Sequence, residues 1–92
     1  MTTLRFTLKK SVSGVVVRYD HGQNKVKEVT YPYEAYTDLD AIKESIKIDS
    51  KIYLSAYHID FTNHHLNTIN EFFKDKEHML KIMMDVYHDD SK

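Results

Sequence analysis

The chain has 92 residues, a net charge of −1 and no cysteine, which fits one folded domain over residues 1–92. Hydrophobic residues make up 41% of it, too many for a disordered segment. The lack of cysteine excludes disulfide frameworks, thiolate nucleophiles and cysteine-ligated zinc. No apolar run reaches the ~18 residues of a membrane-spanning helix, and the N-terminus lacks the apolar stretch of a signal peptide. We therefore expect a cytoplasmic protein with no membrane partner.

The first third of the chain predicts an antiparallel meander of three strands. Residues 3–9 alternate strictly between apolar and polar side chains, which is the pattern of a half-buried strand. Residues 15–19 are β-branched and aromatic, and residues 25–31 form a third run that ends before Pro32. Turn-forming residues, Gly22 among them, separate the runs.

The remainder predicts a short helix, a fourth strand and a helical C-terminal part. Aspartates favour a helix start near residue 38, and apolar spacing carries that helix to about residue 47. Residues 51–59 are apolar on both alternating faces, which indicates a central strand covered on both sides. Residues 63–88 form one long helix or two consecutive ones, and we favour a break near Asp75. The predicted fold class is α+β, with the C-terminal helices packed on the sheet.

Residues 58–65 hold three histidines and an aspartate. His58, Asp60 and His64 are the set that could bind a divalent metal, with His65 as the alternative to His64. Neighbouring histidines on a helix point about 100° apart, so both rarely reach one ion, and no standard metal-binding spacing occurs. We interpret the stretch as a pH-sensitive strand-to-helix corner and expect no cofactor.

A tyrosine-rich segment separates the predicted third strand from the first helix. It contains Tyr31, Tyr33 and Tyr36 around the only proline, followed by Asp38 and Asp40. Tyrosine offers a large amphipathic contact area at low entropy cost, which protein interfaces favour. We predict that these five residues bind a partner protein. The alternative is that two of the tyrosines close the end of the sheet.

Charge is unevenly distributed along the chain. Residues 1–30 carry six basic side chains against two acidic ones, and residues 31–92 carry seven against twelve. The basic set is Arg5, Lys9, Lys10, Arg18, Lys25 and Lys27. If Arg5, Lys9 and Arg18 share the outer face of the sheet, this set could bind nucleic acid, with Tyr19 and Tyr31 as an aromatic platform. Lysines on exposed strands more commonly oppose edge pairing, and two oppositely charged halves also permit a homodimer.

These observations favour a non-enzymatic regulator or inhibitor that binds a larger protein. No phosphate loop, dinucleotide fingerprint or nucleophile elbow occurs. Acidic residues of the predicted helices could meet a basic groove on a nucleic-acid-handling enzyme. The composition, rich in lysine, isoleucine, aspartate, tyrosine and asparagine, resembles that of phage and mobile-element accessory proteins. Many of those block a host protein, and this resemblance implies a host target in nucleic-acid handling or defence. Nucleic-acid binding is the first alternative function, and histidine/aspartate metal binding is the second.

Overall fold

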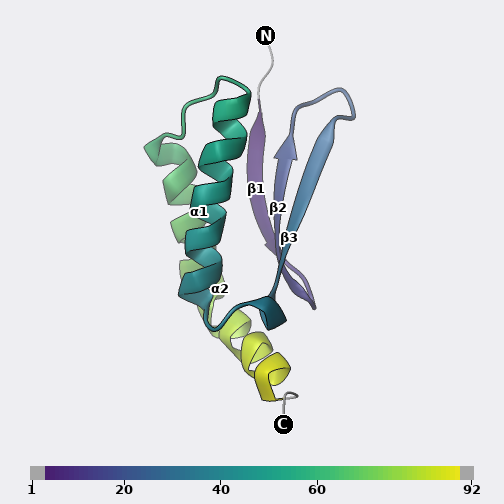
Figure 1. Ribbon diagram of the computed structural model, residues 1–92, viewed down its shortest axis with the longest axis vertical. Coiled ribbons are helices and arrows are strands. Elements are labelled where there is room, and N and C mark those ends of the chain that lie inside the picture. The colour runs from purple at the N-terminus through teal and green to yellow at the C-terminus, as the bar shows by residue number, and fades with distance from the viewer. Residues whose placement is uncertain (1–3, 90–92) are drawn as a thin grey trace.

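The computed structural model describes residues 4–89, and for residues 87–89 the backbone only. Its strands are β1 (Arg5–Lys10), β2 (Gly14–Asp20) and β3 (Val26–Pro32). A short 3₁₀ helix, η1 (Tyr33–Ala35), leads into α1 (Leu39–Ala56) and α2 (Asn63–Asp89). The strands form an antiparallel sheet in the order β1-β2-β3, with both helices on one face (Figure 1). The α+β class and the three-stranded meander are confirmed. Thr3, where we expected the first strand to begin, lies outside the described residues.

The hydrophobic core fills the space between the sheet and the two helices. The inward-facing residues of the central strand, Val15, Val17 and Tyr19, are at most 1% exposed. Antiparallel pairing sets Phe6 of β1 opposite Tyr19 and Tyr31 of β3 opposite Val15. Because side chains alternate along a strand, this register carries one apolar face across all three strands.

The predicted fourth strand is wrong, because residues 51–56 form the last part of α1. Ile42, Ile46, Ser50 and Leu54 recur every four residues and are all fully buried, so the helical repeat continues through this segment. No glycine or proline stops the helix at residue 47. The apparent two-faced strand arose because Ile52 is apolar but points to solvent, where it is 64% exposed.

α2 is one continuous helix of 27 residues, so the break that we favoured near Asp75 is also wrong. The polar residues 74–77 are exposed but do not interrupt the helix. Phe73 and Leu80 lie seven residues apart and are both buried, which keeps them on one helical face. Beyond this point α2 runs past η1 and away from the sheet (Figure 1).

The two ends of the long axis are built from different elements (Figure 1). We call one the closed end: it comprises the β1–β2 turn, η1 and the start of α1. Here Gly14 lies so close to the carbonyl oxygen of Tyr31 that a Cβ atom would overlap it. The other is the open end, which comprises the β2–β3 turn, the end of α1 and the loop of residues 57–62. Its Gly22 has a positive φ of 81° and open space around it.

Candidate functional site

The tyrosine-rich segment does not form the predicted contact surface, because two of its tyrosines are in the core. Tyr31 is 3% exposed and Tyr33 is fully buried. The Tyr31 hydroxyl donates to Oδ2 of Asp49 at 2.9 Å, and the Tyr33 hydroxyl donates to the backbone oxygen of Ser11 at 3.1 Å. Burial, and then the bond to Asp49, raise the pKa of Tyr31. These two residues therefore close the end of the sheet at the closed end, which was the alternative to partner binding.

The other three residues of that predicted surface lie nearer to solvent. Tyr36 is half-buried, and its ring centroid is 6.4 Å from that of Tyr31. Asp38 is the N-cap of α1, since its Oδ1 accepts from the backbone N–H of Ala41 at 2.8 Å. Asp40 is exposed in the first helical turn. Partner binding by Tyr36, Asp38 and Asp40 stays a prediction.

The basic residues do not lie on one surface. Arg5, Lys9 and Arg18 share the outer face of the sheet, which was the condition for nucleic-acid binding, because they lie in register opposite Asp20, Val16 and Thr7. Lys10 has the inward orientation and is half-buried, whereas Lys25 and Lys27 lie at the open end.

Among the side chains that the structure describes, the two tyrosines expected as an aromatic platform do not accompany the cations on the outer face. Tyr19 and Tyr31, which we expected to provide it, are buried under the helices. One of the cations, Lys9, also forms an ion pair of 3.6 Å with Glu28. Tyr19 and Tyr31 therefore do not offer the outer face a stacking surface for single-stranded nucleic acid.

The histidine-rich stretch is a corner between two helices rather than between a strand and a helix. His58 follows α1 with a positive φ of 61°, and His64 lies in the first turn of α2. No group of three or more histidine, aspartate and glutamate side chains is placed to hold a metal ion in the part of the chain that the structure describes. His58, Asp60 and His64 are thus not brought together, and that predicted metal set is wrong.

His65 has a structural role at this corner. Its Nδ1 accepts a hydrogen bond of 3.1 Å from the backbone N–H of Thr62, which is the reciprocal half of a capping box. Burial, and then the neighbouring His64, lower the pKa of His65. The neutral ring is therefore the form that caps α2.

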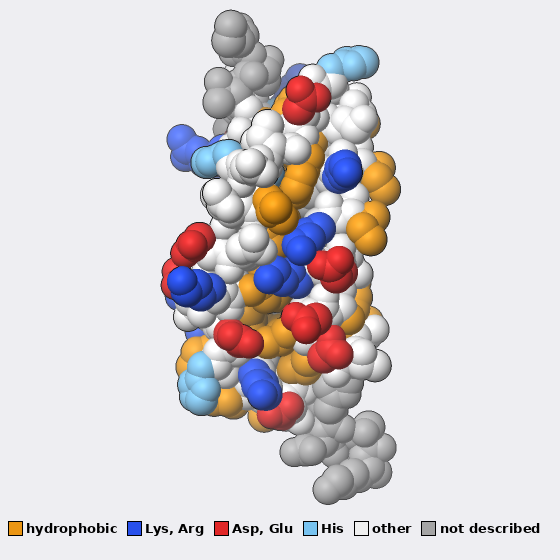
Figure 2. Space-filling view, turned by 90° about the vertical axis from the view of Figure 1, so that its left-hand side faces the viewer, with side chains coloured by type: hydrophobic (Ala, Val, Ile, Leu, Met, Phe, Trp, Pro, Cys, Tyr) orange, Lys and Arg blue, Asp and Glu red, His pale blue; other side chains and the backbone are white. Residues whose placement is uncertain are grey.

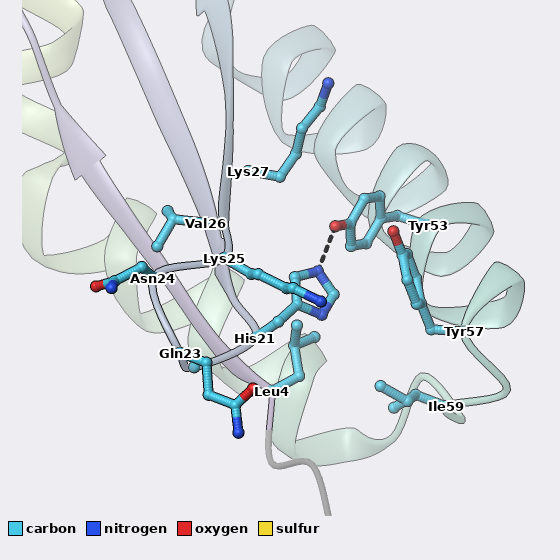
Figure 3. Close-up of a pocket in the computed structure, with 11 residues that line it drawn as sticks. Leu4, His21, Gln23, Asn24, Lys25, Val26, Lys27, Tyr53, Tyr57 and Ile59 are labelled. Atoms are coloured by element: carbon cyan, nitrogen blue, oxygen red, sulfur yellow. Dashed lines mark hydrogen bonds between the residues drawn. The ribbon is translucent and has the colours of Figure 1, made fainter.

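The open end contains a groove between the β2–β3 turn and the end of α1 (Figure 3). It has a volume of about 1200 Å³ and is lined by Leu4, residues 21–27, Tyr53, Tyr57 and Ile59. His21 Nε2 and the Tyr53 hydroxyl are 2.5 Å apart and share a hydrogen bond across it. Tyr53 is in turn stacked on Tyr19 at a centroid distance of 3.9 Å. Burial, then a hydrogen bond with Tyr57, raise the pKa of Tyr53 to about 12.

A second exposed surface lies on α1, beside the edge of the sheet. Ile48 and Ile52 are 58% and 64% exposed; we call this pair the apolar flank. They are four residues apart and so occupy one side of the helix. Asp49, between them in sequence, bonds to Tyr31 of β3, which places the apolar flank next to that strand. Hydrophobic side chains project along this border of the helical face (Figure 2).

Comparison with known proteins finds no family model, no curated protein and no solved structure that matches this chain. Among residues 4–89, no helix is both long and apolar enough to cross a membrane. The groove and the apolar flank are therefore the two surfaces considered for function. Sequence reasoning missed both surfaces, because residues 51–59 were interpreted as a strand.

Proposed function

We propose that the protein is a small binding domain that regulates or inhibits a larger protein, and that it docks through β3 and the apolar flank. The observation that carries this proposal is the exposure of Ile48 and Ile52 beside an edge strand. Water-exposed isoleucines at such a border favour a partner that covers them.

The sheet edge supplies the second half of the docking surface. β3 pairs with β2, and no described strand lies on its other side. Its free backbone groups on that side can pair with an extended segment of another protein. Alternate side chains of the added strand would then face α1 and cover the apolar flank. Burying each isoleucine would contribute about 1–2 kcal/mol.

The chemistry of the edge favours a foreign partner over a second copy of the chain. Lys25 and Lys27 are exposed at the start of β3, and lysines at a strand edge oppose pairing of identical edges. The partner segment would therefore carry apolar side chains on one face and a carboxylate near these lysines. A host protein in nucleic-acid handling or defence is the first class to test, because of the compositional resemblance to accessory proteins. The lack of cysteine suits the reducing cytoplasm in which we place this function.

The test is capture of a partner from nuclease-treated lysate of the producing cells with three tagged forms of the chain. These are the unmodified protein, the double variant Ile48→Asp/Ile52→Asp, and the matched control Met79→Asp/Ile82→Asp. The control residues are exposed to 46% and 47% on α2, so the same chemical change is made elsewhere. We expect one stoichiometric protein with the unmodified chain and the control, but not with the α1 variant. Hydrogen exchange of that complex should show new protection in residues 26–32.

Two results would contradict this docking surface: capture that survives the α1 substitutions, or equal loss in the control. Light scattering tests the remaining possibility, which is that a second copy of the chain occupies the docking surface. A dimer of the isolated chain that dissociates in Ile48→Asp/Ile52→Asp would assign the surface to self-association instead.

A further inference from the structure

We propose that the groove at the open end binds a nucleotide, that is, an aromatic base with an adjacent phosphate. The ligand is either a free mononucleotide or one unit of a single strand. This site shares Lys25 and Lys27 with the proposed docking edge but contains neither residue of the apolar flank, and the inference does not depend on the protein-binding function.

The charge of the groove favours an anion. Its lining includes His21, Lys25 and Lys27 and contains no carboxylate. The ion pairs among the described side chains are formed elsewhere, by Lys9 with Glu28 and by Lys47 with Glu44. The nearby Asp20 accepts from the backbone N–H of its own turn, at Gly22. Two lysines without a counter-charge in a concave site attract a phosphate group.

The aromatic side chains favour a flat ring beside that anion. Tyr53 is held by its stacking on Tyr19 and its bond to His21. Tyr57 is 53% exposed, and its ring centroid lies 4.7 Å from that of His21 and 5.0 Å from that of Tyr53. Tyr53 extends from α1 toward His21, which comes from the turn to meet it, and the ring of Tyr57, just after α1, lies beside Tyr53 (Figure 3). A base can stack on the exposed ring of Tyr57 whatever its identity, because every base has a π-face.

The shape of the groove fits a ligand of this size. Its volume of about 1200 Å³ exceeds the roughly 300–1,000 Å³ of small-molecule sites, so a nucleotide fits with space to spare. The wall formed by the β2–β3 turn has positive φ at Gly22, Gln23 and Asn24. A glutamine in this conformation is uncommon, and such residues cluster where loops shape binding sites.

The test is a titration of the isotope-labelled full chain, followed by amide chemical shifts. The probes are adenosine 5′-monophosphate, uridine 5′-monophosphate, adenosine, inorganic phosphate and a short oligothymidylate. We expect both monophosphates to shift residues 21–27 and 53–59. Changing Lys25 and Lys27 together to alanine should weaken binding at least about tenfold, since it removes the phosphate contacts. Tyr57→Ala should weaken it by about tenfold through lost stacking. Lys51→Ala, an exposed lysine of α1 outside the groove, is the matched control and should change nothing.

Each outcome either identifies the ligand, as a single strand or a free nucleotide, or contradicts the proposed site. Tighter, salt-dependent binding of oligothymidylate than of the monophosphates identifies a single strand as the ligand; equal affinities identify the free nucleotide. Adenosine that binds as well as its monophosphate removes the phosphate subsite, and phosphate that binds as well removes the base subsite; either result overturns the proposal. So does an effect of Lys51→Ala equal to that of the groove lysines, or the absence of shifts with every probe at millimolar concentration.

Discussion

The two ends of the molecule use the same residue type in opposite ways. At the closed end, Tyr31 and Tyr33 lie inside the core with their hydroxyls bonded to Asp49 and to the backbone of Ser11. At the open end, Tyr53 and Tyr57 line a groove, and Tyr57 is more than half exposed. Both pairs lie near the ends of helices and strands. What differs is whether another element covers the rings.

At the closed end Tyr31 is covered from α1, where its hydroxyl bonds to Asp49, and Tyr33 is covered by the C-terminal half of α2. This half of α2 runs past η1 at the closed end, where Met83 approaches the Tyr33 hydroxyl at 3.5 Å and Leu80 is fully buried. α2 begins near the open end but covers β1 rather than the β2–β3 turn, and the rings of His21, Tyr53 and Tyr57 are left along the groove. Whether a tyrosine lies in the core or along a groove therefore depends on which distant helical segments cover it.

The two ends should differ most in how far the free energy of unfolding falls when a tyrosine ring is removed. Tyr33→Ala should lower the free energy of unfolding by about 3–5 kcal/mol, because it removes a fully buried aromatic side chain. Tyr57→Ala should change it by less than about 0.5 kcal/mol, as exposed substitutions do. Urea unfolding followed by circular dichroism measures both values. Equal losses would show that the ends are not built differently.

Gly14 at the closed end and Gly22 at the open end allow the backbone packing of the two ends to be compared. Gly14→Ala should cost about 2–3 kcal/mol, because its Cβ would be forced against the Tyr31 carbonyl. Gly22→Ala should cost only about 1 kcal/mol, the penalty for a side chain at positive φ in open space. The same urea experiment compares them, and a larger loss for Gly22→Ala would contradict the tight packing of the closed end.

The smallest expected effect is a pH dependence at the open end. The pKa of His65 is lower in the folded protein, so the unfolded chain binds more protons as pH falls. Stability should therefore fall below about pH 6.5, by about 0.5–1 kcal/mol for the lost cap. His65→Gln keeps an acceptor for the Thr62 N–H and should remove this part of the dependence. His78→Gln, in an exposed part of α2, is the control, and an equal effect there would exclude the capping role.

The three strands were predictable because their signals are local. Alternation of side chains and the turn residues between them placed each strand to within about two residues of its observed bounds. The outward positions of Arg5, Lys9 and Arg18 followed from the same alternation. These properties depend on period-two geometry, which holds in any half-buried sheet.

The continuation of α1 was not predictable in the same way. Residues 51–57 are compatible with a strand and with a helix, since Tyr53 and Leu54 are adjacent apolar residues in either case. Counting from Ile42 and Ile46 to Leu54 would have favoured the helix and exposed Ile48 and Ile52 as an outward pair. The groove could not be predicted from local patterns at all. It depends on a contact between His21 and Tyr53, which are 32 positions apart and meet only through tertiary packing.

The most direct test of this account is the reactivity of individual tyrosines in the folded protein. Nitration with tetranitromethane under native conditions, mapped by mass spectrometry, reports which rings solvent can reach. We predict that Tyr57 reacts rapidly, and that Tyr31 and Tyr33 react only after unfolding. Rapid nitration of Tyr31 or Tyr33, with Tyr57 protected, would contradict the account and return the tyrosine-rich segment to the surface.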